Sequence, residues 1–363
     1  MPATVSGVSQ PNGPLVSIII PHYNGKFKLQ RCLTSVLSSD YSPFEIVVVD
    51  DCSTDDSSTL FAEFASQITL LRTPRNSGFG VACNLGASKA RGDVFVFLND
   101  DTTVHPEWIG ELIRAVEDSS VGLATPKVLY YRHQNVINAV GGECDLLGFA
   151  WSRGHGQQDA GQYERRELVF YGSCCLLVRR NVWTEIKGFD EKYFMYHEDV
   201  DLCWRAQIAG FPVLYVPSSI VFHDWQRART SVSFVAGQIA RNSLRTVLKD
   251  YQLAELLAIL PLHLAVRLAE VVFFSRSRPE LSKQLVSGLH WNVKMLGDTL
   301  EERRAVQKRR RVSDREICQR MVKGSMELQG VLGRSANPAL PHLFDPSKEE
   351  NSESGTRSSE PEG

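Results

Sequence analysis

Two pairs of adjacent aspartates stand where strands of a parallel sheet are predicted to end. The pairs are Asp50-Asp51 and Asp100-Asp101. Carboxylates held so close repel one another unless a cation or hydrogen-bond donors lie between them. Their hard oxygen atoms suit a divalent metal that keeps coordination positions open for phosphate. Capping of the next helix by Ser53 or Asp55 explains one acid of the four, and Asn99-Asp100-Asp101 taken alone is also ordinary turn composition.

Two later segments carry further candidate groups. His197-Glu198-Asp199-Val200-Asp201 begins a predicted helix, whose amide groups and dipole hold and orient an acid. Two acids are enough to stabilise this end of the helix by their charge, so the presence of the third acid is unexplained. His223 ends the apolar run 220–222. A lone histidine at a strand end is usually structural, and only the other motifs make His223 a candidate for chemistry.

Short apolar runs alternate with helical patterns in the first half of the chain. The apolar runs are at residues 16–20, 44–49, 68–71 and 94–98, and the helical patterns are at 27–37, 57–64 and 82–90. This alternation predicts an α/β fold with a mostly parallel central sheet covered on both faces. Ligands of such a sheet bind at the carboxyl ends of its strands, where the aspartate pairs lie. Further strands are predicted at 176–178 and 213–216 around a helix at 198–209, and from residue 232 the pattern is helical.

Length and charge bound the domain organisation and the partners. A chain of 363 residues favours two domains, or one large α/β domain with an appendage. We expect a flexible N-terminus at 1–14, a catalytic domain at 15–230, a helical region at 231–330 and a disordered acidic tail at 331–363. The net charge of −2 gives no global basic field, which argues against nucleic acid as a partner. Eight cysteines without a Cys-x-x-Cys motif suit a reducing cytoplasm.

The most apolar stretch, residues 253–274, contains four polar or charged side chains. Its longest piece free of formal charge, 256–266, holds Pro261 and is shorter than the roughly 20 residues of a spanning helix, so we expect no transmembrane segment. A basic stretch follows at 303–311. Two interpretations stay open: the region docks on anionic lipid at the cytoplasmic membrane face, or it packs on the catalytic domain or on a second subunit of a homo-oligomer.

Several motifs, in order along residues 15–230, resemble those of family 2 glycosyltransferases. They are Ser17-Ile18-Ile19-Ile20-Pro21-His22-Tyr23-Asn24, Val47-Val48-Val49-Asp50-Asp51-Cys52-Ser53-Thr54-Asp55, Arg75-Asn76-Ser77-Gly78-Phe79-Gly80 with Asn84, and Leu98-Asn99-Asp100-Asp101. Gly188-Phe189-Asp190-Glu191 and the segment from Tyr193 to Arg205 resemble the acceptor-side signature of the rhamnosyltransferase-like branch.

The resemblance implies a GT-A fold and an inverting transfer of a single sugar from a nucleoside-diphosphate sugar. The acceptor would be a saccharide or a lipid-linked saccharide in cell-surface polysaccharide assembly, and the branch favours deoxythymidine diphosphate rhamnose as donor. By the same resemblance, Asp199 would be the general base, and Asp101 and His223 would ligate Mg²⁺ or Mn²⁺. The donor-side residues it implies are Pro21, Tyr23, Asp51, Asn76, Asn84 and Asp100.

Acceptor-side residues are less well defined by the motifs. If Asp199 is the base, Glu198 and Asp201 are either helix-opening or acceptor-binding groups. Trp151, in a glycine-rich region, is a further acceptor-side candidate, with loop packing as the alternative. Direct displacement needs one base and charge neutralisation on the leaving diphosphate, and no second carboxylate as nucleophile.

Other functions fit the sequence less well. A nicotinamide-binding enzyme requires Gly-x-Gly-x-x-Gly after the first strand, and Pro21-His22-Tyr23-Asn24 stands there instead. A catalytically inactive nucleotide-sugar-binding or scaffold protein of the same fold is the main alternative, although Asp101 and Asp199 are both retained. Gln226 and Arg229 have the spacing of the Gln-x-x-Arg-Trp motif of processive synthases, but Thr230 replaces the tryptophan, which favours single additions.

Overall fold

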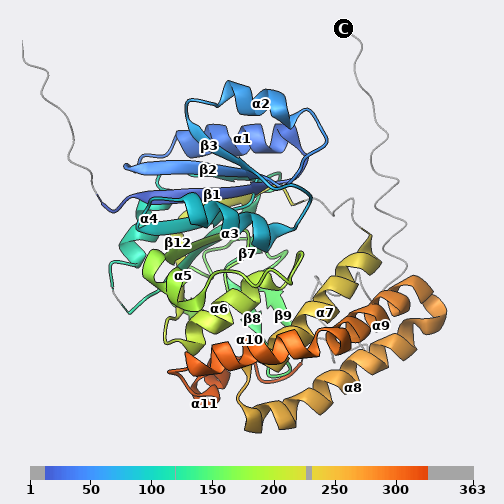
Figure 1. Ribbon diagram of the computed structural model, residues 1–363. Helices are drawn as coiled ribbons and strands as arrows, with labels where there is room; N and C mark the ends of the chain where they lie inside the picture. The colour runs from blue at the N-terminus through green and yellow to red at the C-terminus, as the bar shows by residue number, and fades with distance from the viewer. Residues whose placement is uncertain (1–12, 119, 226–230, 326–363) are drawn as a thin grey trace, which may run out of the picture.

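The computed structural model describes residues 13–118, 120–225 and 231–325. The terminal tail expected at 331–363 and most of the segment expected at 1–14 lie outside the described residues, as do Gln226 and Arg229. Figure 1 shows a sheet domain above a layer of helices.

The first half of the chain forms the alternating elements that the sequence predicts. The strands are β1 (Val16–His22), β2 (Phe44–Asp50), β3 (Ile68–Arg72), β4 (Val94–Leu98) and β5 (Thr102–Val104), and the helices are α1 (Lys26–Leu37), α2 (Ser57–Glu63), α3 (Phe79–Lys89) and α4 (Trp108–Ala115). Strands β3, β2, β1 and β4 lie side by side in that order and are all parallel.

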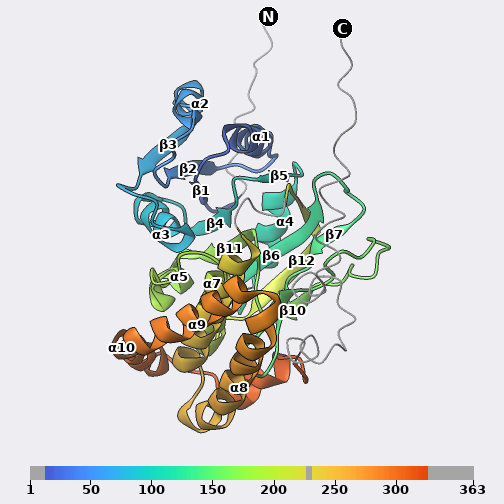
Figure 2. The same cartoon turned by 90° about the vertical axis from the view of Figure 1, so that its right-hand side faces the viewer.

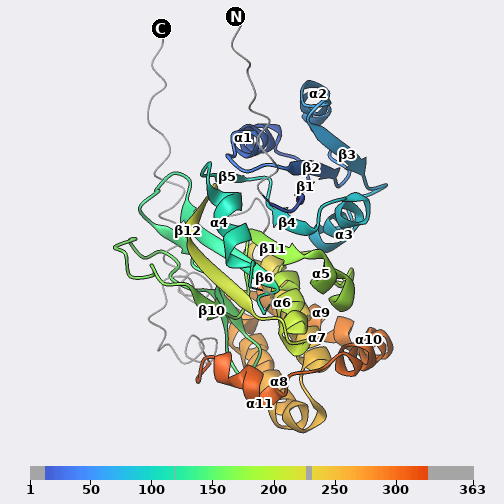
Figure 3. The ribbon, with the colours of Figure 1, turned by 90° about the vertical axis from the view of Figure 1, so that its left-hand side faces the viewer.

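The side chains of β1 alternate between two cores, as a strand with a period of two requires. Ile18 and Ile20 pack with Leu29 and Leu33 of α1, whereas Ile19 packs on the opposite face with Ala82 of α3. Figures 2 and 3 show α1 and α3 on opposite sides of the sheet. Burial of both faces explains why these strands read as unbroken apolar runs.

The second half of the sheet is mixed. Its elements are β6 (Leu123–Tyr130), β7 (Ile137–Ala139), β8 (Gly142–Cys144), β9 (Ala150–Ser152), β10 (Glu167–Val169), β11 (Cys175–Arg179), α5 (Arg180–Ile186), α6 (Glu198–Ile208) and β12 (Val213–His223). Strand β11 is antiparallel to β4 and β6, and β12 runs parallel to β6. The parallel ladders hold most of the paired residues, which confirms a mostly parallel sheet.

The C-terminal region consists of helices, as predicted. They are α7 (Val232–Asp250), α8 (Leu253–Ser277), α9 (Pro279–Lys294), α10 (Leu296–Lys308), α11 (Asp314–Ile317) and a short 3₁₀ turn, Cys318–Arg320. Val247 and Tyr251 belong to the same apolar core as Trp204 of α6. The helices and the sheet therefore share one core.

Helix α8 differs from the expectation. Residues 253–277 form one continuous helix of 25 residues with Pro261 inside it, long and apolar enough to cross a membrane by length and composition. The premise that Pro261 and the charged residues leave this stretch too short for a spanning helix was wrong, whereas the expectation of no transmembrane segment stays a prediction. This criterion is weak evidence for a span, since core helices of water-soluble proteins also meet it.

Candidate functional site

The loops that follow β1, β2 and β4 are joined by His22. Its Nδ1 lies 2.5 Å from Asp100 Oδ2, and its Nε2 lies 2.8 Å from Ser57 Oγ. Because β1 lies between β2 and β4 and is parallel to both, the three carboxyl ends meet at one edge. One buried imidazole thus fixes the relative position of three loops. Burial raises the pKa of Asp100, while the contact with His22 opposes the rise.

A second set of hydrogen bonds joins the first two loops. Asn24, which has a φ of 56°, accepts the amide N–H of Thr54 at 2.8 Å, and Asp55 accepts the N–H of Gly25 at 2.7 Å. Ser57 also donates to Asp55 through its backbone N–H at 3.1 Å and through its hydroxyl. Burial would raise the pKa of Asp55, but these hydrogen bonds lower it to about 2. Asp55 is therefore an ionised structural group.

Asp51 is only 4% exposed, and both of its oxygens are occupied. Thr73 Oγ1 donates to Oδ1 at 2.6 Å, Gly78 N–H donates to Oδ2 at 2.8 Å, and Ser77 N–H lies within 3.1 Å of each oxygen. With about four acceptor sites on a carboxylate, these donors leave Asp51 little capacity for a further hydrogen bond. Asp51 therefore shapes the Ser77-Gly78 loop, and its predicted donor-side contact stays a prediction.

Asp101 and His223 meet although they come from distant parts of the chain. Strand β5 pairs with the end of β12, which sets His223 opposite Thr102, and His223 Nε2 lies 3.1 Å from Asp101 Oδ1. Nε2 of His223 donates to Asp101, and a divalent ion bound at this pair would take the place of that proton. Nδ1 lies 3.1 Å from Asn138 Oδ1 and would keep its hydrogen bond to Asn138. Such a second hydrogen bond is the usual support of a metal-ligating histidine.

The donor set at this pair fits a divalent ion that is shared with a diphosphate. Asp101 Oδ2 lies 3.4 Å from Lys28 Nζ, so a cation already stands beside the carboxylate. Burial would raise the pKa of Asp101, but His223 and Lys28 lower it, which keeps the carboxylate ionised. Within the described ranges, no group of three or more His, Cys, Asp or Glu side chains could hold a metal. The protein would thus offer two ligands, and phosphate oxygens and water would complete the coordination.

Asp199 lies at the first turn of α6, after two strained residues. Tyr196 and His197 have φ values of 65° and 72°, in the left-handed region that L-residues with side chains seldom adopt. Asn242 of α7 holds this turn by donating to the carbonyl oxygens of Met195 and Tyr196 at 3.0 and 2.6 Å. The turn therefore depends on a residue of the C-terminal helices.

The carboxyl groups of Asp199 and Glu198 both have raised pKa values. Burial raises the pKa of Asp199 well above its ordinary value, and burial together with the charge of Asp199 raises the pKa of Glu198. Asp199 is half-buried, and its Oδ1 accepts the N–H of Val200 at 2.8 Å, which leaves Oδ2 for a ligand. A carboxylate with a raised pKa and an uncommitted oxygen is suited to general-base chemistry.

The other motif acids of this region are structural. Asp201 is fully buried, with Lys249 Nζ 2.6 Å from Oδ1 and Arg205 Nη2 2.7 Å from Oδ2. Asp190 lies 2.6 Å from the same lysine and 2.9 Å from Arg245. These ion pairs tie α6 and the loop before it to α7. The predicted acceptor-side role does not fit Asp201, because its carboxylate faces the protein interior.

Asn84 also has a different environment from the one predicted. Its amide donates to the carbonyl of Phe189 at 2.9 Å and to Glu191 at 3.1 Å, and its oxygen accepts the N–H of Phe189 at 3.0 Å. All its polar atoms are used to hold α3 against the Gly188-Phe189 turn. These contacts give Asn84 a structural role, and its predicted part in shaping the donor pocket stays a prediction.

The remaining predicted residues are placed as follows. Pro21 is buried at the end of β1, Tyr23 is 45% exposed, and Asn76 is half-buried in the loop that Asp51 organises. Trp151 is half-buried on β9, and its Nε1 donates to Glu143 at 2.8 Å. Their predicted contacts with donor or acceptor stay predictions.

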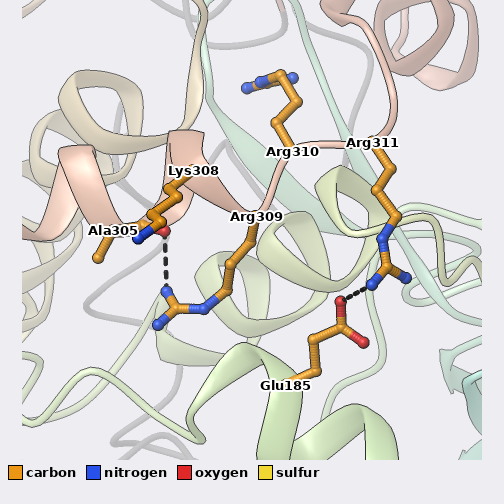
Figure 4. A pocket seen from close by; sticks show the side chains of 6 residues that line it. All are labelled: Glu185, Ala305, Lys308, Arg309, Arg310 and Arg311. Atoms are coloured by element: carbon orange, nitrogen blue, oxygen red, sulfur yellow. Dashed lines mark hydrogen bonds and ion pairs between the residues drawn. The ribbon is translucent and has the colours of Figure 1, made fainter.

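Sequence reasoning missed Asn138, Asn242 and Lys249. None belongs to a motif or carries a spacing that marks it, because each acts only through the tertiary contact that it makes. A hollow of about 460 Å³ lies elsewhere, lined by Glu185, Ala305 and Lys308 to Arg311, and contains none of the predicted site residues (Figure 4).

Comparison with known proteins agrees with this geometry. Residues 17–186 match the family model "Glycosyl transferase family 2". The chain carries a family 2 glycosyltransferase domain. The pre-mycofactocin glycosyltransferase of Mycobacterium tuberculosis is 29% identical over 233 residues, covering 61% of this chain and 46% of the relative. The N-acetylglucosaminyl-diphospho-decaprenol L-rhamnosyltransferase of the same organism is 28% identical, covering 58% and 76%.

Other relatives are longer than this chain. An uncharacterized protein, y4gI, of Sinorhizobium fredii is 26% identical and is covered over 25% of its length. The chain thus spans less than half the length of y4gI and of the pre-mycofactocin enzyme.

Solved structures confirm the GT-A fold. GalNAc-T7 with UDP, GalNAc and Mn²⁺ superposes with a TM-score of 0.55 at 17% identity, covering 77% of this chain and 55% of that one. Mannosyltransferase PcManGT from Pyrobaculum calidifontis with GDP-Man and Mn²⁺ superposes with a TM-score of 0.50 at 16% identity, covering 93% and 89%. At these identities the likeness establishes the fold alone.

Proposed function

We propose that this protein is a metal-dependent, inverting glycosyltransferase that adds a single sugar to a saccharide or lipid-linked saccharide acceptor. The observation that carries the proposal is the 3.1 Å contact between Asp101 and His223 at the carboxyl edge of the sheet. The family 2 domain and the Mn²⁺ in two proteins of the same fold support it. The rhamnosyltransferase relative supports deoxythymidine diphosphate rhamnose as the donor and a polyprenol-linked sugar as the acceptor.

The roles of the chain's own residues follow from their positions. Asp101 and His223 would hold Mg²⁺ or Mn²⁺, which neutralises charge on the leaving diphosphate when bound. Tyr23 and the loops joined by His22 would receive the nucleoside, with Asp100 beside the ribose. Asp199, with one oxygen uncommitted, would take the proton of the acceptor hydroxyl. The free state of all eight cysteines supports a location in the reducing cytoplasm.

The test is a transfer assay with a panel of nucleotide sugars, each with and without Mn²⁺, and with an N-acetylglucosaminyl-diphospho-polyprenol acceptor. We expect Asp199→Asn to lower kcat about 10²- to 10⁴-fold, since a positioned general base contributes this much. The donor-induced thermal shift should persist in Asp199→Asn. It should lose its dependence on Mn²⁺ in Asp101→Asn and His223→Ala.

The outcomes separate the proposal from its alternative. Full transfer by Asp199→Asn would refute the base assignment. A wild-type protein that binds donor with Mn²⁺ but transfers to no acceptor would instead favour an inactive nucleotide-sugar-binding protein. Retention of the anomeric configuration in the product would exclude an inverting mechanism.

A further inference from the structure

The polar and charged side chains of α8 that are most deeply buried are turned toward the protein. His263 Nδ1 lies 2.7 Å from the carbonyl oxygen of Leu147, and its ring stacks on Phe149 at 4.8 Å. Arg267 pairs with Glu270 at 2.8 Å and donates to Ser243 at 3.1 Å. All three of these α8 residues are buried. They attach α8 to the loop after β8 and to α7.

The opposite side of α8 is apolar along most of the helix. We call the exposed residues between 253 and 273 the outer face of α8: Leu253, Ala254, Leu257, Ala258, Pro261, Leu262, Ala265, Leu268, Ala269, Val272 and Phe273. No charged or hydrogen-bonding side chain belongs to this face. Leu257 and Val272 are 68% and 72% exposed. At 1.5 Å per residue the face is roughly 30 Å long.

The polarity of α8 is therefore the reverse of that of an ordinary surface helix, which turns its charges to water. Figures 1 and 2 show α8 at the edge of the molecule farthest from β1 to β3, with α9 beside it. A continuous exposed apolar surface of this extent usually marks a contact with a partner or a membrane. The described residues supply no cover for it.

Charge indicates the kind of partner. Residues 231–325 contain seventeen Lys and Arg against nine Asp and Glu, whereas residues 13–225 contain eighteen against twenty-six. The helical region thus has an excess of eight positive charges and the sheet domain an excess of eight negative ones. Arg276, Lys283 and Lys294, on α8 and the adjacent α9, are exposed.

Two copies of this chain meeting at α8 would bring two positive regions together. An anionic lipid surface offers both the complementary charge and an apolar phase for the leucines. Since α8 is fixed to the protein by His263 and Arg267, it would lie in the interface plane rather than cross the bilayer. We infer that the outer face of α8, flanked by basic residues, docks this protein on an anionic membrane surface.

The inference does not depend on glycosyl transfer, and its test needs no substrate. The full chain is mixed with phosphatidylcholine vesicles, or with vesicles that also contain phosphatidylglycerol, and the sedimenting fraction is measured at two salt concentrations. We expect binding to the anionic vesicles only, weakened by salt because the basic residues are screened. The variant Leu257→Glu/Leu268→Glu should lower the partition coefficient more than tenfold, because two leucines lose their transfer into the apolar phase.

The matched control is Leu70→Glu/Leu168→Glu, which changes two leucines of the sheet domain that are also exposed, at 43% and 48%. It should sediment as the wild type does, and circular dichroism melts should show both variants folded. Equal sedimentation of Leu257→Glu/Leu268→Glu and wild type, or equal binding of wild type to neutral vesicles, would overturn the inference. So would a wild-type dimer in light scattering that the α8 variant converts to a monomer.

Discussion

Replacement of Lys249 by methionine tests whether the ion pairs around it hold the C-terminal helices to the sheet domain. The ammonium group is 1% exposed and lies 2.6 Å from both Asp190 Oδ2 and Asp201 Oδ1. Methionine keeps most of the volume of the side chain and removes the charge. Asp190 retains Arg245 and Asp201 retains Arg205, so each carboxylate keeps one cationic partner.

The expected cost follows from these contacts. Removing one member of a buried ion pair typically destabilises a protein by about 3–5 kcal/mol, because a buried charge loses its compensation. With one cation left on each carboxylate, we expect the lower end, about 3 kcal/mol at pH 7. This is a large share of a typical unfolding free energy of roughly 5–15 kcal/mol.

The pKa of Asp190 predicts how the stability difference between Lys249→Met and the wild type changes with pH. Burial would raise the pKa of Asp190, but the charges of Lys249 and Arg245 hold it below its usual range. The stabilisation from Asp190 is therefore complete above about pH 4 and is lost as the pH falls below that value. In Lys249→Met the pKa of Asp190 rises, so the difference in stability from wild type should shrink on acidification.

Urea denaturation followed by circular dichroism measures this difference. The control is Lys283→Met, which removes a surface lysine 3.6 Å from Glu280 and should cost less than about 1 kcal/mol. A loss in Lys249→Met no larger than that in Lys283→Met would refute the reasoning. A difference that grows on acidification would refute the assigned sign.

Two further predictions concern the site. A Cβ on Gly78 would lie 2.1 Å from the carbonyl oxygen of Phe194, and Gly78 has a φ of 92°. Gly78→Ala should therefore lower the unfolding free energy by roughly 2 kcal/mol or more and reduce sugar transfer. The control is Gly297→Ala, whose Cβ would have no atom within 4 Å and which should change the unfolding free energy by less than about 1 kcal/mol. The raised pKa of Asp199, caused by burial, means that the base is protonated as the pH falls, so kcat/KM measured from pH 5 to 9 should decline on the acidic side well above pH 4. A kcat/KM that stays constant down to pH 5, as a base with the ordinary aspartate pKa of about 3.9 would give, would contradict this assignment.

The strands of the first half could be predicted because burial on both faces makes them continuous apolar runs. The ends of β1, β2 and β4 then had to meet, which brought His22 to Asp100. The meeting of Asp101 and His223 was implied by resemblance only. It depends on β12 running on to residue 223 and pairing with β5, a long-range register that no local pattern encodes.

Polar residues were harder to assign from type alone. The sequence of a motif does not show whether its acid contacts a ligand or a buried lysine. Asp201 contacts a buried lysine, Lys249. The side-chain amide of Asn84 could likewise bind a ligand, but it forms hydrogen bonds with the backbone of Phe189 in another loop. In α8, Glu270 and Arg267 interrupt the apolar pattern of the sequence, which does not show that both lie on the inward side of the helix.

The common core of sheet and helices limits how this chain can be divided. A fragment ending after residue 225 would lack Asn242, which fixes the turn before Asp199, and Lys249, which neutralises two interior carboxylates. It would also leave the ring of Trp204 without its edge contact to Tyr251. The helices therefore cannot be exchanged between homologues as an independent module, and substitutions on α6 and α7 should be inherited together.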